Sequence, residues 1–302
     1  MPSYKLATFE SANGPRAGLI VGDRVVDISE ATSRRDDETV LGLLSCWDEA
    51  RDRLDEVAGR PGTPLSQARL LAPIPVPGTI FCAGANYADH AAEMARRRGQ
   101  EPPPDPHTQG LRSWHFIKAS RCVIGPDAAI ELPKASKKVD WEAELAVVIG
   151  RKAKDVPERD ALAYVAGYTI ANDLSARDLS RREQLPESSS FKNDWVAQKC
   201  FDGACPLGPW ITLAADIPNP HDLAMSLSIN GVVKQDSNTG QMIFSIEEQI
   251  ADLSARMTLW PGDIILTGTP AGVGVARGEF LKSGDVVRIE IAGLGELVNR
   301  VA

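Results

Sequence analysis

Residues 139–150, V-D-W-E-A-E-L-A-V-V-I-G, constrain the fold more than any other part of the chain. Their alternation predicts a β-strand, because side chains in a strand point to opposite faces at every second residue. One face carries Trp141 and Leu145, and the other carries Glu142 and Glu144. Two carboxylates on one face of a sheet repel unless water screens them or a cation neutralises them. The stretch is therefore either an exposed strand with a solvated polar face or a buried strand that binds a hard metal ion.

The composition favours a small-molecule ligand over a nucleic acid. The chain has 302 residues, of which 43% are hydrophobic, and a formal net charge of -8. This size and apolar content suffice for a large core. Because no basic block occurs, we expect no nucleic-acid partner. An anionic ligand would need a metal ion and a few well-placed lysines or arginines to reverse the acidic charge locally.

The cysteines and the N-terminus bear on the location of the protein. Five cysteines occur, and neither their odd number nor their spacing predicts a disulfide framework or a C-x-x-C zinc pair. Reduced thiols are typical of the cytoplasm. The first residues, M-P-S-Y-K-L, do not resemble a signal peptide, and no apolar run approaches membrane-spanning length. We therefore expect a soluble, cytoplasmic protein without a membrane partner.

The pattern of elements predicts two domains. Short strands over 5–10, 17–21 and 24–28 and a helix over 40–58 form a small β-rich unit. A stretch rich in proline and glycine, from residue 59 to residue 77, then suits a linker. We place the boundary near Leu71, which gives a small N-terminal domain over 1–71 and a main domain over 72–302.

The main domain is expected to be α+β and predominantly β. Strands are predicted over 79–83, 115–118, 167–173, 263–267 and 286–291, and helices over 87–98, 174–182 and 245–258. Asn86 is a candidate cap for the helix over 87–98. The proline-rich residues 100–110 cannot be regular structure and are expected to form a loop or lid. This order of elements is not that of a doubly wound nucleotide-binding fold.

Glu142, Glu144 and Asp173 form the candidate metal set. Three oxygen ligands suit Mg2+, with Mn2+ or Ca2+ as substitutes, and leave coordination positions for water and a chelating substrate. Asp173 ends the strand over 167–173, where an aspartate can equally cap a following helix. Spacing alone leaves both interpretations open.

His90 and Glu93 are three residues apart on a predicted helix and are therefore neighbours on its surface. A carboxylate beside an imidazole can orient it, as in a base that activates water. The alternative is a solvated surface pair. The other three histidines have no such neighbour in the sequence and are taken as structural or exposed.

Lys118, Arg177 and Lys199 are the candidate cations for an anionic substrate, since each lies beside a strand or turn already implicated. Each could equally be a surface charge. The glycine-rich turn over 266–274, L-T-G-T-P-A-G-V-G, is neither a Walker motif nor a dinucleotide fingerprint. It allows either a plain tight turn or close backbone approach to a ligand, with the Thr269 hydroxyl available to bind substrate.

Six motifs occur in an order that resembles the fumarylacetoacetate hydrolase family, across about residues 73–302. They are G-A-N-Y-A-D-H-A-A-E from Gly84, F-I-K-A-S from Phe116, D-W-E-A-E-L-A-V-V-I-G from Asp140, G-Y-T-I-A-N-D-L-S-A-R-D from Gly167, Q-K-C-F-D-G-A-C-P-L-G-P from Gln198 and L-T-G-T-P-A-G-V-G from Leu266. The small N-terminal β region is also similar to that of longer bacterial members.

The resemblance implies a β-roll catalytic domain, usually in a homodimer. It implies a divalent metal at Glu142, Glu144 and Asp173. It further implies that His90 and Glu93 activate water on a helix that orders over bound substrate, and that Lys199 faces the reacting group.

The resemblance also implies a reaction class. Family members cleave carbon–carbon bonds in β-diketo acids, so we expect a metal-dependent hydrolase of an acylpyruvate-like acid of the fumarylpyruvate or fumarylacetoacetate type, in aromatic or sugar-acid catabolism. The alternative is a lyase or isomerase on the same scaffold: a 2-oxo acid decarboxylase, a 2-hydroxyhepta-2,4-diene-1,7-dioate isomerase or a sugar-acid dehydratase. A carboxylate-binding protein without turnover is a third hypothesis. Departures from the family pattern, such as Ala119 after Lys118 where proline is frequent, leave the substrate open.

Overall fold

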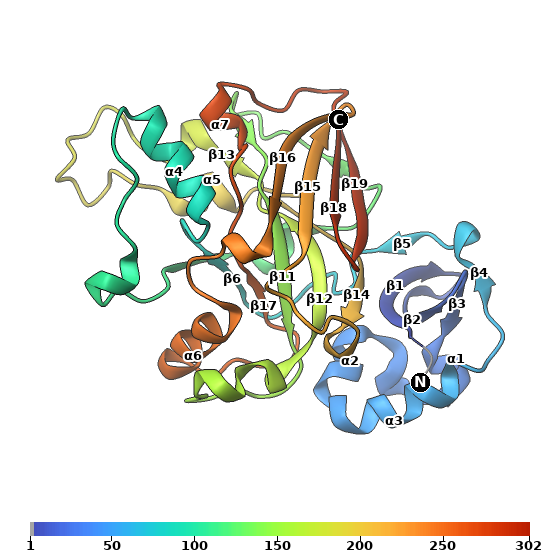
Figure 1. The fold of residues 1–302 in the computed structure, drawn as a ribbon. Coiled ribbons are helices and arrows are strands. Elements are labelled where there is room, and N and C mark those ends of the chain that lie inside the picture. Colours follow the sequence, from blue (N-terminus) through green and yellow to red (C-terminus); the bar gives the residue numbers. More distant parts are fainter. Residues whose placement is uncertain (1–2) are drawn as a thin grey trace.

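The computed structural model describes residues 3–302, and β-strands dominate it (Figure 1). The main sheet has 12 strands. Its path runs β4 (Thr63–Pro64), β3 (Arg24–Asp27), β2 (Gly14–Val21), β1 (Lys5–Ser11), β14 (Cys205–Leu213), β12 (Val165–Asn172), β11 (Ala143–Ile149), β17 (Ile264–Leu266), β6 (Ile80–Ala83) and β7 (His115–Lys118). Two short strands, β5 (Leu70–Leu71) and β8 (Val123–Ile124), pair with β1 and β14 beside this path.

Two further sheets complete the β structure. A five-stranded sheet has the order β16 (Val232–Asn238), β15 (Ala224–Ile229), β18 (Val286–Ile291), β19 (Gly295–Val301) and β9 (Ala129–Ile130). A two-stranded sheet joins β10 (Val139–Asp140) to β13 (Ser175–Ala176). The largest apolar cluster lies between β11 and β15, where Leu145 and Leu227 are buried together. The expected α+β, predominantly β fold is confirmed.

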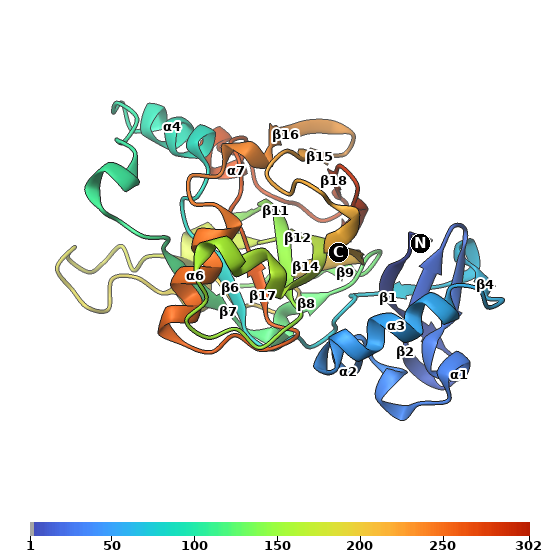
Figure 2. The same ribbon diagram turned by 60° about the horizontal axis from the view of Figure 1, so that its bottom comes forward.

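Few helices cover the sheets. They are α1 (Ile28–Thr32), α2 (Val40–Ser45), α3 (Trp47–Val57), α4 (Ala88–Arg97), α5 (Trp195–Lys199), α6 (Ile246–Arg256) and α7 (Gly274–Arg277). The first three pack on the N-terminal strands, and α4 lies far from them, at the opposite end of the molecule (Figure 2). Helix α6 begins with the predicted capping box, in which Ser245 and Glu248 satisfy each other's backbone N–H. Within residues 3–302, no helix is long and apolar enough to span a bilayer.

The N-terminal strands are joined to the main sheet rather than separated from it. Lys5 and Leu6 of β1 pair with Thr212 and Ile211 of β14. The expected linker is partly wrong, because β4 and β5 within it pair with β3 and β1 as short edge strands. The domain boundary near Leu71 stays a prediction.

Three local predictions are wrong. The helix over 40–58 is broken at Cys46, whose backbone angles (φ -129°, ψ 44°) lie outside the helical region, so that α2 ends before α3 begins. The segment over 174–182 starts as β13 and continues as the 3-10 helix Arg177–Leu179, because Ser175 pairs with Asp140 of β10. Asn86 does not cap α4; its side chain instead accepts the Phe244 N–H at 2.8 Å and donates to two backbone carbonyls.

The alternation that defines β11 is confirmed, but neither face is exposed. Leu145 and Val147 belong to the core that β11 shares with β15, whereas Ala146 lies in a cluster with β6 and β14 on the opposite face. Every residue of the strand is buried. The hypothesis of a solvated strand face is therefore wrong, and Glu144 lies in the interior.

Candidate active site

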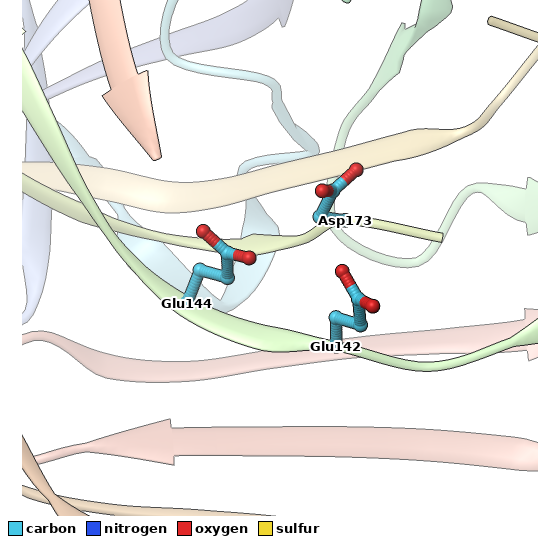
Figure 3. Close-up of side chains that lie close together, drawn as sticks. All are labelled: Glu142, Glu144 and Asp173. Carbon is cyan, nitrogen blue, oxygen red and sulfur yellow. The ribbon is translucent and has the colours of Figure 1, made fainter. Parts of the chain in front are cut away.

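Three carboxylates converge where β11 begins and β12 ends. Glu142 lies one residue before β11, Glu144 lies within it, and Asp173 directly follows β12. One oxygen from each lies within 4.8 Å of the others, and all three side chains are buried. Figure 3 shows Glu142 and Glu144 pointing to the same side of their strand, with Asp173 beside them. The structure thus brings together the three residues that the sequence proposed as a metal set.

Neighbouring side chains fix the backbone at this strand end. The Glu142 N–H donates to Asn172 Oδ1 at 3.0 Å, and the Ala143 N–H donates to Gln235 Oε1 at 2.9 Å. The Asp173 N–H donates to the Glu142 carbonyl at 2.9 Å. Because these buried backbone groups all have partners, the carboxylates are held in place by the fold itself.

Three cations contact the carboxylates. Lys199 Nζ donates to Glu142 Oε2 at 2.7 Å and to Asp173 Oδ2 at 2.6 Å, so it bridges the two. Lys118 Nζ donates to the other Asp173 oxygen at 2.5 Å. Arg177 Nη2 donates to Glu142 Oε1. Bonds between charged partners are the strong hydrogen bonds of a buried site, and these orient two of the three ligands.

Asp140 belongs to the same cluster, although sequence reasoning missed it. Its Oδ2 accepts from Arg177 Nε at 2.8 Å, and its carboxylate also accepts the N–H groups of Gly274 and Val275 at 2.6 and 2.9 Å. The alternation contained the signal, since Asp140 precedes Glu142 by two residues. Asp140 holds the guanidinium of Arg177 against Glu142.

Carboxylates outnumber cations at this centre. The four carboxylates are those of Asp140, Glu142, Glu144 and Asp173, and the three cations are Lys118, Arg177 and Lys199. Glu144 forms no ion pair within residues 3–302, and its Oε2 accepts the Gly268 N–H at 2.7 Å. Burial and the nearby charges of Asp173 and Glu142 raise the pKa of Glu144 well above its usual range. A cation beside Glu144 would relieve this repulsion.

The donor set fits a divalent metal ion. Hard cations prefer carboxylate oxygens at about 2.0–2.6 Å, and oxygens within 4.8 Å of one another can share one such ion. Burial opposes ionisation of Glu142, but Lys199 and Arg177 outweigh it and hold the pKa of Glu142 well below its usual range. Glu142, Glu144 and Asp173 would hold the ion.

His90 and Glu93 lie on α4 and face each other, as predicted. His90 Nδ1 is 3.8 Å from Glu93 Oε2, and the same oxygen accepts the Gly272 N–H at 2.9 Å. This ties Glu93 to the glycine-rich turn. His90 Nδ1 is buried and has no hydrogen-bond partner within residues 3–302. The imidazole is thus held beside a carboxylate with one nitrogen free of a full hydrogen bond.

A cavity of about 440 Å³ opens over the carboxylates. Seven of the nine predicted site residues line it: His90, Glu142, Glu144, Asp173, Arg177, Lys199 and Thr269. Lys118 and Glu93 do not line it. Lys118 is fully buried behind Asp173, so its predicted contact with substrate stays a prediction. The Thr269 hydroxyl is already an acceptor for Gln235 Nε2 at 2.9 Å.

Comparison with known proteins places this arrangement in a family. The model described as "Fumarylacetoacetate (FAA) hydrolase C-terminal" matches residues 79–302. This chain belongs to the fumarylacetoacetate hydrolase family. The match covers every carboxylate and cation of the centre, and the family resemblance of the motifs is confirmed.

Relatives in the fumarylacetoacetate hydrolase family differ in the reaction that their names state. The mitochondrial oxaloacetate tautomerase Fahd2a of Rattus norvegicus is 45% identical over 243 residues, which cover 80% of this chain and 72% of that protein. The maleylpyruvate hydrolase of Sphingobium sp. SYK-6, solved with manganese(II) and pyruvate, has a TM-score of 0.76 and 30% identity, covering 99% and 98% of the two chains. A 2-hydroxyhepta-2,4-diene-1,7-dioate isomerase of Mycobacterium marinum has a TM-score of 0.74 and 34% identity, again covering 99% and 98%.

These relatives are enzymes, and one of them holds a divalent metal ion. The metal-binding expectation for this chain therefore has two supports, the manganese complex and the carboxylate triad. Because a tautomerase, a hydrolase and an isomerase share the fold, membership of the family alone does not select the reaction.

Proposed function

We propose that the protein is a metal-dependent tautomerase, which interconverts the keto and enol forms of a 2-oxo acid with a second carbonyl or carboxyl group, oxaloacetate being the simplest such acid. The observation that carries this proposal is the position of His90. Its imidazole lines the same cavity as the three metal-binding carboxylates, and Glu93 lies beside its buried Nδ1 at 3.8 Å. A group that can accept and return a proton is what tautomerisation requires.

The reaction needs one proton removed and one added. A bound divalent metal would supply positive charge that draws electron density from the 2-oxo carboxylate group of the substrate. His90 would take the proton from C3, and the oxygen at C2 would gain one, which gives the enol with no net change in atoms. Despite burial, Asp173 and Glu142 raise the pKa of Lys199, so its ammonium stays charged and can stabilise negative charge at the C2 oxygen.

Sequence relationship supports tautomerisation over hydrolysis. The rat protein whose name states oxaloacetate tautomerase is 45% identical to this chain, whereas the maleylpyruvate hydrolase is 30% identical. We therefore rank the tautomerase ahead of the hydrolase that the sequence motifs suggested first.

Hydrolysis of a carbon–carbon bond in an acylpyruvate is the second candidate. The pairing of His90 with Glu93 favours it, because a histidine oriented by a carboxylate can also take a proton from water. The attacking oxygen would then bond to the remote carbonyl carbon, and the C3–C4 bond would break with C3 gaining a proton. Pyruvate and a carboxylic acid would be the products.

Mg2+ is the metal that we propose, with Mn2+ and Ca2+ as substitutes. Three carboxylates leave several coordination positions for water and substrate, which is how Mg2+ is usually bound. Titrating chelator-treated protein with each metal and following its thermal unfolding would rank the three ions. The expected homodimer, the absence of nucleic-acid and membrane partners and the cytoplasmic location stay predictions.

A paired assay tests the proposed function. Freshly prepared enol oxaloacetate is mixed with protein and Mg2+, and the loss of enol absorbance is compared with Mg2+ alone, since free metal also speeds the reaction. An acylpyruvate is assayed in parallel for released pyruvate. Faster enol decay, lost in EDTA and in His90→Gln, supports the tautomerase. Pyruvate release without accelerated enol decay would instead support the hydrolase, and neither activity would overturn both.

A further inference from the structure

Three aromatic side chains form one side of the cavity, and we call them the aromatic wall: Trp114, Phe116 and Trp195. Trp114 directly precedes β7, Phe116 lies in β7, and Trp195 begins α5. The two tryptophan rings meet edge to face with centroids 5.2 Å apart, and Phe116 stacks on Trp195 at 5.3 Å. These separations are typical of favourable aromatic contacts. The wall is therefore one packed unit built from two separate segments of the chain.

The wall leaves a large apolar surface open to the cavity. Trp114 is 48% exposed and Trp195 is 43% exposed. Large aromatic side chains that remain open in a concave site mark a place where a ligand can bury them. The wall thus offers apolar area that the fold itself does not use.

The backbone makes specific room for Trp114. A Cβ built on Gly84 would lie 1.5 Å from the Trp114 ring, so no other residue type allows the indole its present position. The Gly84 N–H also donates to the Trp114 carbonyl at 2.9 Å. Trp114 is thereby seated against the turn after β6, at the cavity.

The aromatic wall begins at the reaction centre. Lys199 Nζ, which bridges Glu142 and Asp173, lies 5.0 Å from the Phe116 ring centroid. The apolar residues Ala91, Met94 and Ala95 of α4 also line the cavity. A substrate with its 2-oxo acid group at the carboxylates would therefore extend into a space lined by aromatic rings and apolar side chains of α4, together with the polar residues Arg98, Gln100 and Glu101.

We propose that the aromatic wall is the specificity subsite for an aromatic substituent on the far end of the 2-oxo acid, with Trp114 as its selecting residue. This inference rests on the proposed function, because it places the 2-oxo acid group at the metal centre. Flat conjugated groups stack on aromatic rings, and saturated or small groups gain less. The cavity of about 440 Å³ lies within the range of pockets for ligands much larger than oxaloacetate.

Binding of two 2-oxo acids, each brought to keto–enol equilibrium beforehand, tests the subsite without relying on turnover. The dissociation constants of pyruvate and phenylpyruvate are measured by calorimetry on the Mn2+-loaded protein. The two acids share the 2-oxo acid group and differ only in the phenyl ring. We expect phenylpyruvate to bind about tenfold more tightly than pyruvate, as ring stacking and apolar burial predict. Equal affinities in the wild type would overturn the proposal.

Three variants locate the preference on the wall. Trp114→Ala should reduce the preference for phenylpyruvate to about twofold or less, whereas Trp114→Phe should keep most of it. Gly84→Ala keeps the indole but displaces it, and should have the same effect as Trp114→Ala. The matched control is Trp260→Ala, because Trp260 is 55% exposed and lies outside this cavity. If folded Trp114→Ala and Gly84→Ala proteins kept the full preference for phenylpyruvate, Trp114 would not be the selecting residue.

Turnover then separates this inference from the proposed function. The kcat/KM is compared for two 2,4-dioxo acids that carry a methyl or a phenyl group on C4. Loss of the phenyl preference in Trp114→Ala, with the preference retained in the Trp260→Ala control, supports the subsite. If neither acid turns over but the phenylpyruvate preference persists, the proposed function fails and the subsite stands.

Discussion

The metal centre and the elements that cover it are built in opposite ways. The centre stands on β11 and β12, whose residues are buried along their whole length. The cover consists of α4 and residues 98–113, where nearly every side chain from 98 onward is exposed. A few polar contacts hold this cover, among them Ser237 Oγ to Asp89 Oδ2 at 2.6 Å. Segments with few buried contacts open at low free-energy cost, whereas the strands of a core open only with the whole fold.

The difference assigns different tasks to the two regions. Ligand geometry must be held tightly, and that is possible only where buried strands and their hydrogen bonds define it. A substrate must still enter and leave, so His90 is carried on a helix near an exposed loop. We call the metal centre on β11 and β12 the floor of the site. The following predictions test whether metal binding depends on the floor alone and whether catalysis depends on both the floor and the cover.

The largest effect should come from Glu144→Gln. Removing this ligand should lower the rate at least a thousandfold, since the metal supplies several kcal/mol of transition-state stabilisation. Because the variant also removes repulsion between buried carboxylates, it should melt higher than wild type in EDTA and gain nothing from Mg2+. Thermal unfolding with and without Mg2+ measures the change in melting temperature and the loss of stabilisation by Mg2+. Glu290→Gln, an exposed change on β18, is the control. A variant that Mg2+ still stabilises would remove Glu144 from the metal set.

His90→Gln should lower the catalytic rate and leave metal binding at the floor unchanged. We expect a loss of about 100-fold to 10,000-fold in kcat, the usual contribution of a general base. The Mg2+ affinity, measured by calorimetry, should stay within about twofold of wild type because His90 is not a proposed ligand. A parallel loss of Mg2+ affinity would mean that α4 belongs to the metal centre and that the two regions are not separable.

Lys118→Met should act on stability rather than on substrate binding. The change leaves Asp173 buried with one lysine fewer, and breaking a buried ion pair costs about 3–5 kcal/mol. Urea unfolding in EDTA should show this loss, and Mg2+ should restore part of it by replacing the missing charge. Lys134→Met, at an exposed position, is the control. If stability is unchanged while KM rises tenfold, Lys118 contacts the substrate as the sequence suggested.

The smallest expected effect is a pH-dependent loss of order in the loop over residues 100–110 of the cover. His107 Nδ1 and Nε2 lie 2.8 Å from Asp105 Oδ1 and Glu248 Oε1, respectively. Since carboxylates only accept, both nitrogens must carry hydrogens, and the two bonds raise the pKa of His107. The charged His107 therefore stabilises the ordered conformation of residues 100–110 at a pH below the usual histidine pKa. This stabilisation is lost as the pH rises through the raised pKa of His107.

Hydrogen exchange over residues 100–110 measures this effect. Between pH 6 and pH 9 we expect protection to fall about threefold in the wild type, after correction for intrinsic exchange, because an exposed pair is weak. His107→Gln should show low protection at both pH values. His221→Gln, which removes a similar contact to Glu247 on α6, should behave like wild type. A pH response that survives in His107→Gln would contradict the role of His107.

Sequence patterns predicted that the three carboxylates of the metal centre lie together, although their spacing alone left the metal-binding interpretation open. Alternation placed Glu142 and Glu144 on one face, and the strand ending at Asp173 brought the third carboxylate beside them. The same alternation pointed to Asp140, but a carboxylate four residues from Glu144 was not recognised as part of the cluster.

The burial of individual side chains and their contacts with distant segments of the chain could not be predicted in the same way. Nothing local to Lys118 indicates that its ammonium lies behind Asp173, because that position depends on the pairing of β6 with β7 and β17. The extended start of the segment over 174–182 likewise comes from a tertiary contact, the pairing of Ser175 with Asp140. The aromatic wall was missed because Trp114 and Trp195 are 81 residues apart and meet only in the folded chain.

The pairing of β1 with β14 also protects a strand edge of the main sheet. Lys5 and Leu6 occupy the edge of β14 beside Ile211 and Thr212. A catalytic domain that began near residue 72 would leave this edge unpaired, and an open apolar strand edge is a template for adding another strand. The N-terminal strands of this chain therefore protect this part of the edge of β14 from the addition of another strand.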